Sequence, residues 1–119
     1  MTDEQLQKIA VADEVLIETS DEQGPRRTII WVVVEGGEVF VRSVLGEQGH
    51  WYRRAVADPE VNLIVSGEQH RFRAISASDD DSVRRASNGF VAKYRPGRSL
   101  DAMIRDEVLA TTLRLDPVD

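Results

Sequence analysis

The sequence predicts a single domain over residues 1–119, folded as a mainly β structure (α+β): a small barrel of six mostly antiparallel strands with flanking helices. Short apolar segments are separated by turn dipeptides at Gly36-Gly37 and Gly67-Glu68, which is typical of antiparallel hairpins. A chain of 119 residues has the size of one domain. Six strands in so short a chain are expected to curl into a barrel, because closure removes exposed strand edges.

The N-terminal third is expected to contain one helix and two strands. Thr2 and Gln5 fit a capping box, which predicts a helix over residues 3–11. Alternating apolar residues predict a half-buried strand over residues 14–19, and the turn-forming residues 21–25 predict a loop. The strongest strand signal covers residues 27–35.

The strand over residues 27–35 is expected to be apolar on both faces. Its centre, residues 29–34, is an unbroken run of β-branched residues around Trp31. One face can fill the barrel, and the other must be covered by a helix or by a second subunit. We therefore expect a homodimer.

The remaining elements follow from similar local signals. The pattern predicts strands over residues 38–44, 61–66, 69–76 and 108–115, the last ended by Asp116-Pro117. It predicts a helix over residues 48–57, a long helix from Asp79 or Asp80 to Pro96-Gly97, and a short helix capped by Ser99.

The composition excludes several classes of function. There is no cysteine, so disulfides, thiolate metal sites and cysteine nucleophiles are excluded. The net charge of −6 argues against nucleic-acid and anionic-membrane partners, because both need an excess of basic residues. Only Lys8 and Lys93 are lysines, so 13 of the 15 basic residues are arginines, whose planar donors suit a single anion site.

The N-terminal residues and the longest apolar run give an expected location. The N-terminal residues 1–5 are polar and acidic, unlike a secretory signal. The longest strongly apolar run has six residues, whereas a membrane helix needs about 20. We expect a cytoplasmic protein without a membrane partner.

The segment from Arg42 to Arg54 carries the candidate anion site. A strand ends at Arg42 and Ser43, a loop with two glycines follows, and a helix begins after Gly49. Helix N-termini present free N–H groups, an arginine can bind a phosphate through two donors, and a serine hydroxyl can add a hydrogen bond. Arg53, Arg54 and Arg27 can supply further charge. An ordinary strand–turn–helix junction with a surface arginine explains the same pattern.

A set of short motifs spread over the whole chain adds a resemblance. These are Ile30-Trp31-Val32-Val33, Val41-Arg42-Ser43, Gly49-His50-Trp51-Tyr52-Arg53, Tyr94 and Ala110-Thr111-Thr112-Leu113-Arg114-Leu115. With them the chain resembles an uncharacterised bacterial family, domain of unknown function 2255. More distantly it resembles the flavin-binding split-barrel proteins, which include pyridoxamine-phosphate oxidases and deazaflavin-dependent nitroreductases.

The resemblance implies a six-stranded split barrel and a homodimer with a flavin between its subunits. The cofactor would be FMN or deazaflavin (F420), its phosphate held by Arg42, Ser43, Gly49, Arg53 and Arg27. The ring would pack on Trp31 or Trp51. No catalytic acid or base is assigned, because the cofactor supplies the redox chemistry.

Departures from both relatives keep a second interpretation open. The oxidases have an arginine followed five residues later by a lysine; Arg27 matches the first, but position 32 is valine. The nitroreductases have a Lys-Ser-Gly, where this chain reads Gln-Gly-Pro-Arg at residues 23–26. The alternative is a non-enzymatic dimeric barrel that binds or sequesters a small anionic ligand, or that has lost its cofactor.

No metal site is expected. Asp79, Asp80 and Asp81 stand at a helix start, where carboxylates usually serve as caps. His50 and His70 have no metal-binding partner nearby in the sequence.

Overall fold

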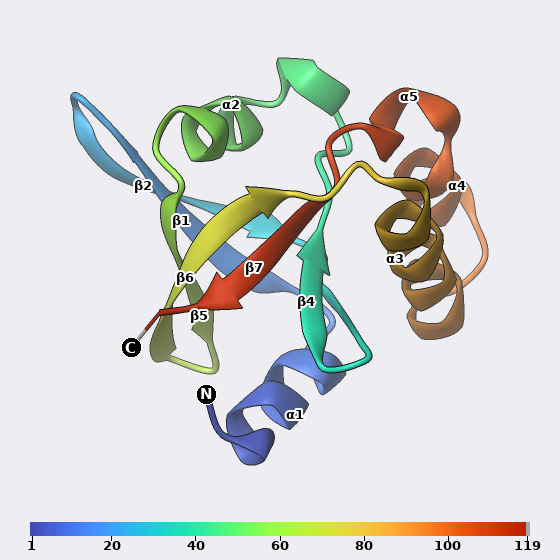
Figure 1. Cartoon of the computed structure of the whole chain (residues 1–119), viewed down its shortest axis with the longest axis horizontal. Helices are drawn as coiled ribbons and strands as arrows, with labels where there is room; N and C mark the ends of the chain where they lie inside the picture. The colour runs from blue at the N-terminus through green and yellow to red at the C-terminus, as the bar shows by residue number, and fades with distance from the viewer. Residues whose placement is uncertain (119) are drawn as a thin grey trace.

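The computed structural model describes residues 1–118. Within them, seven strands form a single antiparallel sheet (Figure 1). The strands are β1 (Val15–Asp21), β2 (Gly24–Ile30), β3 (Val33–Glu35), β4 (Glu38–Val41), β5 (Glu60–Val65), β6 (Glu68–Ser76) and β7 (Leu113–Pro117). The helices are α1 (Asp3–Val11), the 3-10 turn η1 (Gly46–Gln48), α2 (His50–Ala57), α3 (Asp80–Lys93), α4 (Arg98–Ile104) and α5 (Asp106–Leu109).

The sheet curls into a half-barrel that remains split between its two edge strands. The strand order is β2-β1-β5-β6-β7-β4-β3, with every neighbouring pair antiparallel. The edges, β2 and β3, follow one another in the chain and are separated only by Trp31 and Val32. So short a connection between opposite edges requires the sheet to curl. The mainly antiparallel barrel with flanking helices is confirmed, with seven strands instead of six.

The predicted strand over residues 27–35 is wrong as one element. It divides after Ile30 because the backbone of Val32 is hydrogen-bonded to Lys93, the last residue of α3, and to Tyr94, which follows that helix. The Lys93 ammonium donates to the Val32 carbonyl at 2.6 Å, and the Val32 amide donates to the Tyr94 hydroxyl at 3.2 Å. The predicted loop over residues 21–25 is also too long, because Asp21 already pairs with Gly24.

The C-terminal strand begins later than predicted. Residues Asp106–Leu109 form α5, and β7 runs on through Pro117. The hydroxyls of Thr111 and Thr112 donate to the carbonyls of Val108 and Leu109, at 2.7 and 2.8 Å. These bonds turn the chain out of α5 at residues whose β-branched side chains suggested a strand.

Two helices close the ends of the barrel. α1 and α2 lie at opposite ends of the sheet in Figure 1. Ile9 of α1 and Trp51 and Ala55 of α2 are buried in the cluster that fills the barrel. The capping box at Thr2 and Gln5 is present, with N–O distances of 2.9 and 3.1 Å. No helix within residues 1–118 is long and apolar enough to cross a bilayer.

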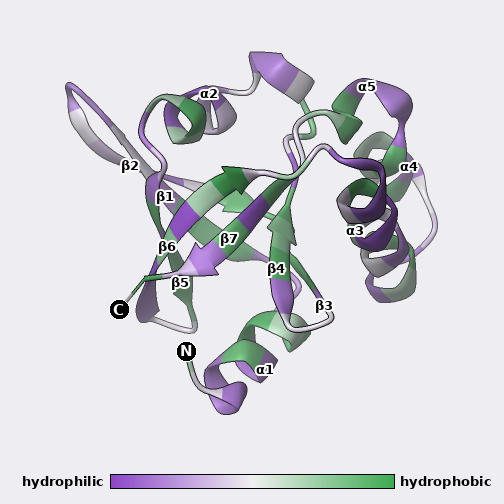
Figure 2. Ribbon diagram, in the orientation of Figure 1, coloured by the Kyte–Doolittle hydropathy of each residue, from purple (hydrophilic) through white to green (hydrophobic). Residues whose placement is uncertain are grey.

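A second core lies outside the barrel, against α3 and α4. Alternate residues of β4 point to the two cores: Val39 and Val41 into the barrel, and Phe40 toward Phe90 of α3. Figure 2 shows the apolar part of β4 in green beside α3. Val33 packs in the same outer cluster. The second apolar face predicted for residues 29–34 is therefore covered there by α3, whereas Ile29 stays 64% exposed.

Candidate functional site

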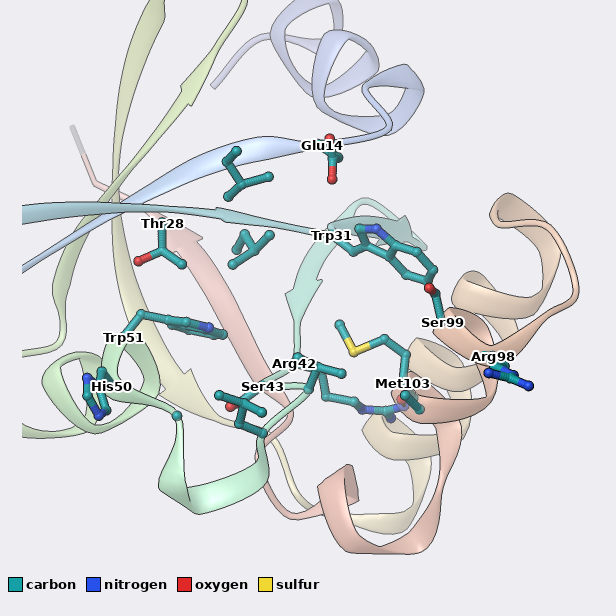
Figure 3. Close-up of a pocket in the computed structure, with 16 residues that line it drawn as sticks. Glu14, Thr28, Trp31, Arg42, Ser43, His50, Trp51, Arg98, Ser99 and Met103 are labelled. Carbon is teal, nitrogen blue, oxygen red and sulfur yellow. Dashed lines mark hydrogen bonds between the residues drawn. The ribbon is translucent and has the colours of Figure 1, made fainter.

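A cavity of about 670 Å³ opens between the end of β2, the β4–α2 connection and α4 (Figure 3). Its volume lies within the range of small-molecule sites. Eight apolar or aromatic side chains, seven polar or charged ones and one glycine line it. The lining residues are Glu14, Thr28, Ile29, Ile30, Trp31, Arg42, Ser43, Val44, Leu45, Gly49, His50, Trp51, Arg98, Ser99, Ala102 and Met103.

Three exposed apolar side chains border the cavity. Ile29 is 64% exposed, Leu45 66% and Val44 43%. They come from β2 and from the loop after β4 and line the same opening. Apolar side chains gathered at one opening are typical of an interaction surface rather than of scattered exposure.

The two tryptophans predicted as ring-packing residues lie on different walls of the cavity (Figure 3). Trp31 is half-buried and stacks on Tyr94, with ring centroids 3.8 Å apart and planes 2° from parallel. Trp51 is only 7% exposed and meets Tyr52 edge-on, at a centroid distance of 6.2 Å. The cavity thus has two rigidly held aromatic walls.

Arg42 is buried, with 1% of its surface exposed. Its Nε donates to the Thr112 hydroxyl at 2.8 Å, and Nη1 donates to the Ser87 hydroxyl and the Met103 carbonyl, both at 3.0 Å. Nη2 donates to the Val83 carbonyl at 3.0 Å. Arg42 therefore connects the end of β4 to α3, α4 and the start of β7, and the interpretation of it as a surface arginine is wrong.

The charge of Arg42 has no acidic partner in the part of the chain that the structure describes. Among residues 1–118 no carboxylate oxygen lies within 4.0 Å of its guanidinium. Burial lowers the pKa of Arg42 to about 10, so the side chain remains protonated at neutral pH.

Ser43 and Gly49 contact each other within the turn that leads into α2. The Ser43 hydroxyl donates to the Gly46 carbonyl at 2.7 Å, and the Ser43 amide donates to the Thr111 hydroxyl at 3.1 Å. A Cβ on Gly49 would collide with the Ser43 hydroxyl. The absence of a side chain at Gly49 is thus explained by packing within the turn.

The other predicted cationic residues lie apart from the cavity. Arg27 projects from β2 and pairs with Glu18 at 2.9 Å. Arg53 is exposed on α2, and neither it nor Arg27 lines the cavity. Arg54 donates to the Thr19 hydroxyl at 2.9 Å. The fold thus gathers Trp31, Arg42, Ser43, Gly49 and Trp51 and separates Arg27 and Arg53 from them.

Residues 5–115 match the family described as "Uncharacterized protein conserved in bacteria (DUF2255)". The chain belongs to this family. The resemblance stated from the motifs is thereby confirmed. No curated protein matches the chain.

Solved structures similar to this DUF2255 chain are split-barrel proteins. One is a putative pyridoxamine 5'-phosphate oxidase from Listeria innocua, 11% identical over 98% of this chain and 93% of that one, with a TM-score of 0.72. Another is HutZ, the heme storage protein from Vibrio cholerae, 15% identical over 98% and 89%, with a TM-score of 0.73. A third is a FAD-binding protein from Mesorhizobium loti, 12% identical over 100% and 91%, with a TM-score of 0.62. At these identities the likeness shows the fold.

Several cavity residues of the DUF2255 chain had no clear signal in its sequence. Arg98 and Ser99 reach the cavity because α4 packs beside it, and Glu14 lies at its far edge (Figure 3). His50, which the sequence led us to consider and reject as a metal ligand, is exposed and lines the cavity. The packing of α4 brings Arg98 and Ser99 to the cavity, whereas Glu14 comes from the residue before β1 and His50 from the start of α2.

The acidic residues before α3 have a structural explanation. Asp79 caps the helix and accepts a hydrogen bond from the Ser82 amide at 3.0 Å, which lowers the pKa of the Asp79 carboxyl. Within residues 1–118 no group of three or more histidine, cysteine or acidic side chains is placed to hold a metal ion.

Proposed function

We propose that this DUF2255 protein binds a flavin-type cofactor, FMN or deazaflavin (F420), and uses it in an oxidoreductase reaction. The observation that carries the proposal is the apolar cavity of about 670 Å³ with Trp31 and Trp51 on two of its walls. Planar aromatic rings pack well against such side chains. The pyridoxamine-phosphate oxidase and FAD-binding descriptions of two structural neighbours support the same ligand class.

The chain's residues fit the ring of such a cofactor better than its phosphate. The donors of Arg42 and the hydroxyl of Ser43 bond within the chain. Arg98 and His50 are exposed lining residues, and no hydrogen bond or ion pair within residues 1–118 engages either side chain. We assign direct phosphate contact to these two residues, and the ring to the apolar wall between the tryptophans.

A homodimer completes the proposed site. The apolar opening formed by Ile29, Val44 and Leu45 is the surface that a second copy would cover. Burying it would exclude water from the ring and remove exposed apolar area. This argument rests on the three side chains around the cavity, since α3 covers the outer face of Val33.

Cofactor binding and assembly are tested together. Titrating purified protein into FMN, and separately into F420, should quench the cofactor fluorescence saturably at one cofactor per subunit, while sedimentation reports a dimer. The variant Ala102→Trp fills the cavity from α4 and should abolish the quenching. Failure of both cofactors to bind at 100 µM protein would overturn the proposal.

A second candidate is a non-enzymatic module that binds heme, a small anionic aromatic ligand. The observation in its favour is the exposed His50 imidazole at the cavity, together with the heme storage protein among the structural neighbours. Hemin added to the protein should then give a sharp Soret band that is lost in His50→Ala. Quenching of flavin fluorescence without a sharp Soret band would favour the first proposal. A sharp Soret band without flavin quenching would favour the second.

A further inference from the structure

The cavity wall contains a buried positive charge. Arg42, Arg98 and Glu14 are the lining residues with a full formal charge, and only Arg42 among them is buried. Exposed charges are weakened by water and salt, whereas a buried charge keeps a long-range field. The electrostatic character of the inner wall is therefore set by Arg42.

The contacts of Arg42 orient its guanidinium without neutralising it. All four of its acceptors are neutral: two carbonyls and two hydroxyls, at 2.8–3.0 Å. The ring of Phe90, 5.4 Å away, is neutral as well. Hydrogen bonds of this kind meet the donor requirement of a buried cation but leave its net charge in place. The guanidinium therefore keeps its full positive charge beside the cavity.

The cavity also has charges of opposite sign on two of its sides. In Figure 3 the Glu14 carboxylate lies at the edge opposite Arg42, with the apolar space between them. An anion would be repelled from the Glu14 edge and attracted toward the Arg42 wall. The two charges together define an orientation for a charged ligand.

We propose that Arg42 acts through its field, without direct contact, and selects an aromatic ligand whose ring system carries a negative charge. This inference rests on the proposed function because it concerns the same cavity. It differs from phosphate binding, since Arg42 keeps its four contacts within the chain. For a flavin-type ring, the same field would favour the negative charge that accumulates on reduction.

A matched pair of dyes tests the selection. 8-Anilinonaphthalene-1-sulfonate carries one negative charge on its ring, and N-phenyl-1-naphthylamine has the same rings without it. The ratio of the two dissociation constants, measured by fluorescence, should favour the anion by about tenfold in the wild-type protein. Arg42→Gln should reduce this ratio to about one with little change for the neutral dye, whereas Arg42→Lys should retain most of it.

Two control variants test whether the dyes bind in the cavity and whether the anion preference comes from Arg42. Ala102→Trp fills the cavity and should remove binding of both dyes, which shows that they occupy it. Arg53→Gln removes an exposed cation that does not line the cavity and should change the ratio less than twofold. An anion preference that survives Arg42→Gln, or that is lost in Arg53→Gln, overturns the proposal.

Salt dependence gives an answer even where Arg42→Gln does not fold. In the wild-type protein a preference caused by a buried charge should stay within about twofold between 20 mM and 1 M NaCl, because buried charges are screened little. A ratio that falls to one at 1 M NaCl overturns the proposal. The dyes contain no flavin, so an anion preference without FMN or F420 binding would refute the proposed function alone.

Discussion

The indole of Trp31 lies flat on the phenol of Tyr94, and the Tyr94 hydroxyl bonds to the backbone of both Asp13 and Val32. The hydroxyl donates to the Asp13 carbonyl at 2.7 Å and accepts from the Val32 amide at 3.2 Å. Tyr94, from the end of α3, thereby joins the segment before β1 to the link between β2 and β3. One cavity wall is held in place by a residue that does not itself line the cavity.

Tyr94→Phe should destabilise the protein by about 1–3 kcal/mol while keeping the stack, because the Val32 amide loses its partner. Tyr94→Leu should cost about 0.5–1.5 kcal/mol more, because the stack is lost as well. Urea unfolding followed by tryptophan fluorescence measures both. The matched control is Tyr52→Phe, whose hydroxyl has no hydrogen-bond partner within residues 1–118, and equal losses for Tyr52→Phe and Tyr94→Phe would contradict the assignment.

Arg42→Met should destabilise the fold by about 3 kcal/mol or more, because two carbonyls and two hydroxyls lose their donor at once. Arg27→Met is the control: it removes an exposed ion pair with Glu18, worth at most about 1 kcal/mol. Denaturant midpoints with unchanged slopes give the comparison. Similar midpoints for the two variants would show that the Arg42 network contributes little.

The elements that could be predicted are those whose signals are local. The capping box of α1, the Asp79 cap of α3 and the glycine hairpins are visible in a few neighbouring residues. The split after Ile30 is not, because its cause lies in Lys93 and Tyr94, more than 60 residues away in the sequence. The helix α5 was missed because the hydroxyl bonds of Thr111 and Thr112 override their strand preference.

The candidate site likewise combines residues with local sequence signals and contacts from distant parts of the chain. The sequence placed Arg42, Ser43, Gly49 and Trp51 near one another because the strand–turn–helix connection is continuous, whereas Trp31 was included only through the family resemblance. It could not reveal that the carbonyls of Val83 and Met103 hold the guanidinium inside the protein, since these belong to distant helices. The sequence led us to expect that Arg42 contacts a phosphate. In the structure Arg42 is buried, and its donors bond within the chain.

Lys93 predicts a pH dependence of stability. Burial lowers the pKa of Lys93 to about 8, below its ordinary value of 10.5. Between these values the unfolded state binds more protons than the folded state, so stability should rise with pH from about 8 to 10. Lys93→Met should remove this rise, whereas the exposed Lys8→Met should keep it. The test is to measure the free energy of unfolding at half-unit pH steps. If the plots of this free energy against pH are parallel for wild type and Lys93→Met, the role of Lys93 is refuted.

Gly49 and Ser43 should be energetically coupled. Gly49→Ala places a methyl group against the Ser43 hydroxyl, so it should be clearly destabilising. Ser43→Ala removes the obstructing oxygen at the cost of its bond to the Gly46 carbonyl. The double variant should therefore lose at least about 0.5 kcal/mol less than the two single losses added together. Additive losses in a double-mutant cycle would mean that the contact does not explain the glycine.

The apolar opening of the cavity should control assembly. Leu45→Asp puts a charge into the surface formed by Ile29, Val44 and Leu45, and it should weaken self-association by at least about tenfold, because a buried unpaired charge costs several kcal/mol. Val56→Asp is the matched control: Val56 is a comparably exposed valine, at 59%, on α2, and it does not line the cavity. Sedimentation equilibrium over 1–100 µM protein measures both dissociation constants. A dimer that is weakened by Val56→Asp and unaffected by Leu45→Asp would place the interface elsewhere, and a monomer at 100 µM wild-type protein would rule out the completed site.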